Sequence, residues 1–430
     1  MVEFRPFRAW RYNPQVVGDV ASVICPPYDL ISPEMEESLR RRSPYNVVHL
    51  EGGEAPQRTG PEDDPYARAA VLFAQWQRQG VLRRDAQPCF YLVRHRFSFG
   101  GRMGSRLELY GCLRVEEYER RVVLPHEYTR PAPVQDRVAL MEAAQANFSP
   151  IMSLYRDREA SLKPVFDRVM AGKPALQVSG APEQDFTLWP ITAPAMQESI
   201  RQALAQKVVF LADGHHRYEA ALQFQRRSAG GRKSDPNAAA NFVMMALISF
   251  DDPGLMVLPY HRVLGGLSPA ALEQVRQRLD RLFEAQAVGL AAGGTGAGLV
   301  KQVAAQGRNR QVMGLVESGG AARLLALREG ADRRGWGPLA VSEAWILEEQ
   351  VLKPVLGEAT PRHLSYVHDH QAALDQVTAG AQQMAFLLRP FPLDHFEAIV
   401  GEGQRLPSKS TFFYPKLATG LVISQLEGPL

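Results

Sequence analysis

The residues best suited to chemistry lie in one short turn, Asp213–Arg217, which reads Asp-Gly-His-His-Arg. The apolar run Val208–Ala212 before it is typical of a buried strand, and the spacing of Tyr218–Arg227 after it predicts a helix. The first N–H groups of a helix lack partners within the helix, and the helix dipole is positive there, so an anion is favoured. This turn is therefore a candidate phosphate site.

Each residue of the turn suits a different task. Gly214 lets a phosphate or a second backbone approach closely, and the Arg217 guanidinium can donate to two phosphate oxygens. His215 and His216 offer hydrogen-bond donors or metal ligands. Asp213 can hold a metal ion, take the proton of a reacting hydroxyl or cap the helix. The alternative is an Asp cap followed by solvated polar residues, which we disfavour because several ionisable groups around one glycine are a poor way to begin a helix.

A second candidate is Pro125–Thr129, which follows the apolar run Val122–Leu124. Glu127 can act as a general base, with His126 as its partner or as a phosphate ligand. Thr129 joins them as a phosphate-binding candidate, and Arg137 follows a few residues on. By itself this segment is a weak signal, because a glutamate after a strand is more often a surface carboxylate.

Two further segments carry cations among apolar or aromatic residues. Leu258–Arg262 places His261 and Arg262 on an apolar strand, where a phosphate or carboxylate ligand would explain them. A buried histidine with an arginine at the rim explains them about as well. Pro407–Lys416 combines two lysines and three hydroxyls with three aromatic residues, which suits an anion or a stacked ring. A terminal strand with flanking lysines is the alternative there.

Length and composition indicate a globular protein of more than one domain. The chain has 430 residues, 45% hydrophobic and 22% charged, which excludes a mainly disordered protein. The net charge of +3 gives no case for a nucleic-acid or membrane partner. The three cysteines are far apart with no Cys-x-x-Cys pair, so neither a disulfide framework nor a structural zinc site is expected. We find no signal-like or membrane-length apolar run and expect a cytoplasmic location.

The elements that must position these residues alternate between helices and strands. Phe90–Phe99 and Arg106–Val115 predict a hairpin, and Arg58–Pro65 predicts a loop. Helical spacing is found in Pro65–Gly80, Gln135–Ala146, Pro194–Gln206, Pro269–Ala285 and Val341–Val355, and strand-like runs in Ser149–Tyr155, Asn241–Phe250, Leu255–Leu264 and Met384–Leu388. The pattern predicts a mixed α+β protein in three regions: 1–120 with the hairpin, 121–265 with the Asp213–Arg217 turn, and 266–430.

Six motifs, in order along the chain, resemble the signature of one family. They are Cys25-Pro-Pro-Tyr-Asp29, His126-Glu-Tyr-Thr129 with Asp136-Arg137, Asn147-Phe-Ser-Pro150, Asp213-Gly-His-His-Arg-Tyr218, Leu258-Pro-Tyr-His-Arg262 and Pro407–Lys416. The family is the one catalogued as domain of unknown function 1015, and the resemblance extends from Phe4 to about Val422.

The resemblance implies a fold and an activity. Some relatives are free serine kinases, which transfer a phosphoryl group from ATP or ADP to the hydroxyl of L-serine. They resemble the partition-protein and sulfiredoxin nucleotide-binding fold, in which a Gly-x-x-Arg turn at a helix start holds phosphates. Gly214–Arg217 matches that turn, and Glu127 stands where these kinases place a catalytic carboxylate. The resemblance thus implies such a core embedded in a larger mixed-sheet protein, whose long terminal parts differ from the shorter kinases and leave the substrate open.

Our first hypothesis is a phosphotransferase that uses ATP or ADP with Mg²⁺ and acts on a small hydroxyl compound, for which L-serine is one candidate. The expected partners are the nucleotide and this small-molecule substrate. The residues assigned are Glu127, Asp213 and His215 for catalysis; Gly214, His215, His216, Arg217, His126 and Thr129 for phosphate or nucleotide; and Arg137, His261, Arg262, Lys409, Ser410 and Lys416 for substrate or anion.

Two alternatives stay open. One is a nucleotide-binding regulator without turnover, because similar turns serve as switches in partition proteins. The other is a metal-dependent hydrolase, whose ligands would come from His126, Asp213, His215, His216 and His261. No His-Glu-x-x-His motif supports the hydrolase, so it rests on residue types alone.

Overall fold

The protein is described here by a computed structural model that covers residues 1–52, 64–181, 184–229, 235–289, 296–308 and 310–430. Most of the loop expected over Arg58–Pro65 therefore lies outside the described residues. The chain divides into two compact units, the first Met1–Leu255 with Pro415–Leu430 and the second Met256–Tyr414. Both contain helices and strands, which confirms the mixed α+β class. The division into regions 1–120, 121–265 and 266–430 follows motif order and stays a prediction.

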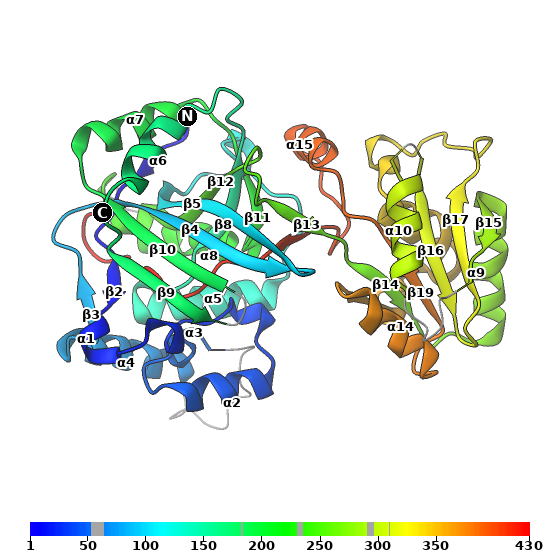
Figure 1. Ribbon diagram of the computed structural model, residues 1–430, viewed down its shortest axis with the longest axis horizontal. Helices are drawn as coiled ribbons and strands as arrows, with labels where there is room; N and C mark the ends of the chain where they lie inside the picture. The colour runs from blue at the N-terminus through cyan, green and yellow to red at the C-terminus, as the bar shows by residue number, and fades with distance from the viewer. Residues whose placement is uncertain (53–63, 182–183, 230–234, 290–295, 309) are drawn as a thin grey trace. The chain divides into compact units, whose positions relative to one another are not determined.

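One mixed sheet organises the first unit (Figure 1). Of its nine described strands, eight run in the order β6-β11-β8-β12-β5-β4-β10-β9, and the ninth, β1, pairs with β5 outside that order. Pairs β6–β11 and β8–β12 are parallel and the others antiparallel. The bounds are β1 Phe4–Arg5, β4 Phe90–Phe99, β5 Arg102–Arg114, β6 Val123–Leu124, β8 Ile151–Tyr155, β9 Leu176–Ala181, β10 Gln184–Ile191, β11 Val209–Asp213 and β12 Phe242–Ser249.

The expected hairpin forms at the centre of this sheet. Strands β4 and β5 pair from Tyr91 opposite Tyr110 to Phe99 opposite Arg102, around the two-residue turn Gly100–Gly101. Both turn residues have positive φ, 56° and 76°, which glycine adopts without the penalty of a Cβ atom. The second strand therefore begins earlier than the spacing predicts.

Helices cover this sheet, and their starts are set by local signals. Ser32 accepts a hydrogen bond from the Met35 N–H and Asp64 accepts one from the Tyr66 N–H, each just before a proline at the first helical position. Helix α5 packs on both α4 and α8, and apolar residues of α5 and α8 join the main core. The bounds are α1 Pro14–Val17, α2 Pro33–Arg42, α3 Val48–Glu51, α4 Pro65–Arg78, α5 Pro131–Ala144, α6 Lys163–Met170, α7 Pro194–Ala205 and α8 His215–Ala229; two short ribbons pair β2 Trp10–Tyr12 with β3 Leu82–Arg84 and β7 Ala146–Asn147 with β21 Ser424–Gln425.

The second unit is built on an antiparallel sheet in the order β15-β17-β16-β19-β14-β18. Two apolar clusters form on residues that alternate along its strands, as in Met313 and Leu315 for one cluster and Val312 and Val316 for the other. The strands are β13 Met256–Leu258, β14 His261–Leu264, β15 Phe283–Ala287, β16 Val312–Glu317, β17 Ala322–Leu327, β18 Leu364–Val367, β19 Met384–Leu387 and β20 Phe412–Tyr414, with β13 paired to β20 outside the sheet. The helices are α9 Pro269–Leu282, α10 Ala297–Gln306, α11 Glu343–Trp345, a π-helix Ile346–Leu352, α12 Lys353–Leu356, α13 Thr360–His363, α14 His370–Thr378 and α15 Leu393–Gly401.

Three sequence expectations are corrected. Helix α9 ends at Leu282, because Phe283 is a buried residue of β15 that pairs with Leu327. The strand expected over Leu255–Leu264 is broken into β13 and β14, since Pro259 has no N–H for a ladder. Helix α8 begins three residues earlier than its apolar spacing predicts, within the polar part of the turn.

No helix in the described part of the chain is long and apolar enough to cross a membrane.

Candidate functional site

The candidate site is built where β11 passes directly into α8. Strand β11 ends at Asp213, Gly214 forms the turn with φ +91°, and α8 starts at His215. A Cβ atom on Gly214 would lie 3.0–3.1 Å from three atoms of the Arg217 guanidinium group. Glycine is therefore required at this position for two reasons: its backbone has a positive φ, and a Cβ atom would collide with the Arg217 side chain that lies over the turn.

Three charged side chains meet across this turn. Arg217 Nη2 donates to Asp213 Oδ2 over 2.7 Å, and Lys416 Nζ donates to the other oxygen, Asp213 Oδ1. Arg217 Nη1 donates to the Pro150 carbonyl oxygen. Its Nε is buried and has no hydrogen-bond partner among the described residues. Two cations and one anion are thus gathered at the positive end of α8.

The two histidines of the turn hold a neighbouring loop. The His126 N–H donates to His215 Nε2 over 3.3 Å, and the Arg130 N–H donates to His216 Nε2 over 3.1 Å. Both rings accept through Nε2, so each neutral ring carries its proton on Nδ1. The histidines therefore fix the segment 125–130, which carries Glu127, against the start of α8.

His126 is buried, and its Nδ1 lies 2.7 Å from the Leu211 carbonyl oxygen, to which it donates. Burial lowers the pKa of His126, and the nearby Glu127 carboxylate only partly opposes that effect. Glu127 Oε1 lies 3.9 Å from His126 Nε2, and the Glu127 side chain is 22% exposed. Thr129 is half-buried on the same segment. The loop therefore presents one carboxylate that solvent can reach.

Arg137 belongs to a buried network beside the turn. Its Nε donates to Asp136 Oδ2 over 2.6 Å, and its Nη1 lies 3.3 Å from Glu51 Oε1, which also accepts from Ser149 Oγ over 2.7 Å. The guanidinium carbon lies 4.0 Å from the centre of the Tyr28 ring. Burial raises the pKa of Tyr28 to about 12 even though Arg137 and Arg217 act in the opposite direction.

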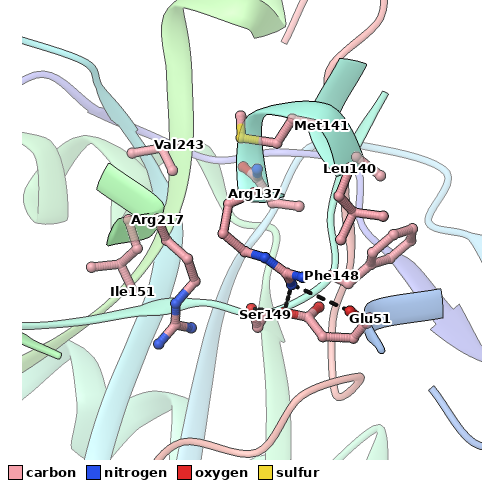
Figure 2. Close-up of a pocket in the computed structure, with 11 residues that line it drawn as sticks. Glu51, Arg137, Leu140, Met141, Phe148, Ser149, Ile151, Arg217 and Val243 are labelled. Atoms are coloured by element: carbon pink, nitrogen blue, oxygen red, sulfur yellow. Dashed lines mark hydrogen bonds and ion pairs between the residues drawn. The ribbon is translucent and has the colours of Figure 1, made fainter. Parts of the chain in front are cut away.

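Figure 2 shows the small cavity between these groups, with the Arg137 guanidinium directed at Glu51 and Ser149. Its volume is about 30 Å³, and Arg217 and Val243 also line it. A space of that size holds one or two water molecules. We therefore do not assign it to a nucleotide.

The first unit thus collects residues from five of the six motifs. Tyr28, Arg137 and Pro150 come from the first three motifs, Arg217 from the fourth and Lys416 from the end of the last. Sequence order separates them widely, and their contacts place them around one turn. Glu51, which joins Arg137 to Ser149, lies outside every motif and was missed because nothing in its local sequence marks it.

The remaining motif residues lie in the second unit and are engaged in its structure. Arg262 is fully buried and donates to the backbone carbonyl oxygens of Tyr260, Ser408 and Lys409, and also to Glu348 over 2.9 Å. His261 Nδ1 accepts from the Leu388 N–H over 3.1 Å. Lys409 Nζ lies 5.4 Å from the Tyr260 ring centre, and Ser410 Oγ donates to the Pro407 carbonyl over 2.6 Å. Their anion-binding role stays a prediction.

The candidate metal ligands do not form a metal site in the described residues. There, no group of three or more His, Cys, Asp or Glu side chains is placed to hold a metal ion. His126 and His215 are close, with ring centres 4.4 Å apart at 83°, but His215 Nε2 already accepts a backbone N–H. His261 belongs to the other unit.

Comparison with known proteins identifies the family. Residues 4–355 match the family described as "Protein of unknown function (DUF1015)", so the chain is a member of that family. This confirms the family that the motifs indicated; five of the six motifs lie within the matched residues, and the sixth, Pro407–Lys416, lies beyond them. No curated protein matches the sequence.

Several solved structures resemble this one only distantly. A free serine kinase in complex with AMP is 12% identical, with a TM-score of 0.35, over 70% of this chain and 89% of that one. A conserved hypothetical protein from Pyrococcus furiosus is 12% identical with a TM-score of 0.34, over 70% and 92% of the two chains. SbnI with a C-terminal truncation from Staphylococcus aureus is 12% identical with a TM-score of 0.36, over 75% and 87%. At this level of likeness no residue role is transferred.

Proposed function

We propose that this protein is a nucleotide-dependent phosphotransferase that acts on a small hydroxyl compound, with free L-serine as the first acceptor to test. The observation that carries the proposal is the Arg217–Asp213–Lys416 cluster across Gly214 at the start of α8. Phosphoryl transfer depends chiefly on positioning and charge stabilisation. A helix start with two cations offers both to a phosphate group. L-Serine is chosen from the sequence resemblance to relatives that are free serine kinases.

The proposed roles follow from the contacts. Gly214 gives close access to the backbone N–H groups of α8, and Arg217 and Lys416 supply positive charge. Glu127 is the better candidate for the general base, because both oxygens of Asp213 already accept from cations whereas Glu127 is partly exposed. Asp213 then acts by holding the two cations in place. His215 and His216 position the Glu127 segment rather than touching phosphate themselves.

The residues present suit a nucleotide and Mg²⁺. The buried Arg217 Nε lacks a partner in the described residues, and a phosphate oxygen is an acceptor for it. The Glu127 carboxylate is an oxygen ligand of the kind that Mg²⁺ prefers, whereas both oxygens of Asp213 accept from Arg217 and Lys416. When bound, the nucleotide supplies the phosphoryl group and Mg²⁺ offsets its charge. Arg217 and Lys416 would orient the phosphates, and Glu127 would hold the acceptor hydroxyl and take its proton.

Phosphorus NMR tests the proposal. The full chain is incubated with Mg²⁺, ATP or ADP, and L-serine within a pool of small hydroxy acids. We expect a new phosphomonoester signal that is lost in Glu127→Gln and Arg217→Ala but kept in Glu142→Gln, which changes an exposed carboxylate paired with Arg227. Absence of a new signal with every acceptor would contradict a phosphotransferase.

A second candidate is a nucleotide-binding regulator without turnover. It is favoured by the closed arrangement of Arg217 and Lys416 on Asp213, which a phosphate could open by competing for the two cations. The two candidates differ in one result. Nucleotide that raises the melting temperature without yielding any product supports the regulator, whereas product formation supports the enzyme.

A further inference from the structure

Three ionisable side chains that belong to none of the six motifs lie fully buried in the β4–β5 hairpin. Arg106, Glu108 and His95 have no exposed surface. Glu108 Oε1 lies 2.7 Å from Arg106 Nη2 and 2.9 Å from His95 Nδ1. Tyr110 donates to the other Glu108 oxygen over 2.9 Å. Arg106, Glu108 and Tyr110 alternate along β5 and so share one face of the sheet.

Burial of such a network is unfavourable unless its groups are paired. Burial alone would raise the pKa of Glu108, but the Arg106 guanidinium and the His95 ring outweigh it and lower the pKa to about 2. Glu108 is therefore a charged anchor for Arg106 at all ordinary pH values. An anchored guanidinium has fixed directions for its remaining donors, since its fork is planar and rigid.

One of those donors leads to the candidate site. Arg106 Nη2 donates to the Pro415 carbonyl oxygen over 2.9 Å, within the buried region. The next residue is Lys416, whose Nζ donates to Asp213. Proline has no N–H, so this carbonyl is the one backbone hydrogen-bonding group that Pro415 possesses. Arg106 therefore fixes the chain directly beside the lysine.

We propose that Arg106 is a positioning residue, which places the Lys416 ammonium on Asp213 through the Pro415 carbonyl. Its consequence for catalysis rests on the proposed function, whereas the placement of Lys416 does not. Glu108 and His95 act one step further away, by holding Arg106. Loss of the Arg106 donor would release the segment 415–416 and leave Asp213 with Arg217 alone.

Chemical protection of Lys416 tests the placement without any substrate. Lysines of the full-length chain are acetylated under limiting reagent, and the rate at each site is read by mass spectrometry. The Lys416 side chain is 9% exposed and paired with Asp213, so it should react slowly in the wild type. In Arg106→Lys, which keeps a buried positive charge, we expect its rate to rise about tenfold, the effect of losing one such hydrogen bond.

A matched variant separates this effect from general loosening of the sheet. Arg94→Lys changes the same residue type on the adjacent strand β4, where Arg94 contacts Met170 and Trp189. It should leave the Lys416 rate unchanged. Lys207, which lies 3.5 Å from Asp157 in the same unit, is the internal reference. An unchanged Lys416 rate in Arg106→Lys, or an equal rise at Lys207, would overturn the proposal.

Kinetics then address the catalytic consequence separately. If the wild type turns over, Arg106→Lys should lower kcat/KM about tenfold, and adding it to Lys416→Met should lower kcat/KM no further. Additive losses in the double variant would contradict action through Lys416. If the wild type shows no turnover, the proposed function fails, and the acetylation rates still decide whether Arg106 places Lys416.

Discussion

Arg217 Nη2 lies 2.7 Å from Asp213 Oδ2, so the two ends of the Asp213–Arg217 turn are joined across Gly214. The same carboxylate binds Lys416 through its other oxygen. An incoming phosphate must therefore compete with Asp213 for both cations, or bind beside the intact cluster. This relationship sets the expected results of the following substitutions.

Arg217→Ala should weaken nucleotide binding, because a charge-assisted contact to phosphate is lost. The expected cost is about 2 kcal/mol, or roughly thirtyfold in Kd. Calorimetric titration with ADP and Mg²⁺ measures it. Arg226→Ala is the control, since Arg226 lies on the same helix and pairs at the surface with Glu117. Equal affinity in wild type and Arg217→Ala would remove Arg217 from the site.

Glu127→Gln should leave nucleotide affinity near that of the wild type and lower turnover by about a hundredfold or more, the usual contribution of a general base. Affinity is measured by calorimetry and turnover by product formation. The amide keeps the size of the side chain but cannot take a proton. A variant that retains wild-type turnover would show that Glu127 is not the base.

Gly214→Ala should affect both stability and binding. The positive φ of +91° costs a residue with a Cβ about 1–2 kcal/mol, and that Cβ would also displace the Arg217 guanidinium. Gly180→Ala is a close control, because Gly180 has φ +89° and a Cβ atom added there would meet no atom within 4 Å. Both variants should have a lower melting temperature than the wild type. Titration with ADP should show a reduced affinity in Gly214→Ala alone.

The second unit should lose stability below neutral pH through His261. Burial, with the nearby His370 and Arg262, lowers the pKa of His261 to about 3 from an ordinary value of 6.5. As the pH falls, His261 takes up a proton in the unfolded chain before it does so in the folded chain. The free energy of unfolding is therefore highest above pH 6.5 and decreases as the pH falls from 6.5 to 3. At pH 5 the loss is about 2 kcal/mol.

Hydrogen exchange in peptides of β14 and β19 measures this loss locally, at pH 7.5 and pH 5 after correction for intrinsic rates. His261→Asn places an oxygen near the position of Nδ1, which accepts from Leu388, and does not titrate. The variant should show a smaller change in protection between the two pH values. An identical change in wild type and variant would assign the pH dependence to other groups.

Lys409→Ala tests the prediction that Lys409 binds substrate or phosphate. The Lys409 side chain lies over the Tyr260 ring. The Lys409 carbonyl, which accepts a hydrogen bond from Arg262, belongs to the backbone and is kept in Lys409→Ala. If Lys409 contacts an anion, the affinity of Lys409→Ala for substrate or phosphate should be about tenfold lower than that of the wild type, with little change in melting temperature. A lower melting temperature with unchanged affinity would leave Lys409 a purely structural role.

The sequence identified the turn and the elements beside it because their signals are local. The apolar run of β11, the glycine at Gly214 and the polar start of α8 occupy consecutive positions, and so do Phe90–Phe99 and the strand that pairs with it. Boundaries were less accurate. Phe283 suits a helix by spacing, and its pairing with Leu327 in the sheet decides that it is a strand residue.

The local sequence pattern did not predict which polar residues are buried or what they contact. The alternation of Arg106, Glu108 and Tyr110 in β5 is typical of a strand with one solvated face, yet all three side chains are buried. Arg262 was predicted as an anion ligand from its residue type. In the structure its donors are directed to the carbonyl oxygens of Tyr260, Ser408 and Lys409, and the last two lie 146 and 147 residues away in the sequence.

The sequence by itself therefore determined the family, the mixed α+β class and the strand–turn–helix at Gly214. Only the tertiary structure decided what surrounds that turn. Lys416 is 203 residues from Asp213, and Pro415 is 309 residues from Arg106. Such contacts arise when long loops close over a common core, and their energy depends on burial and geometry. Neither is encoded in the residues adjacent to each partner.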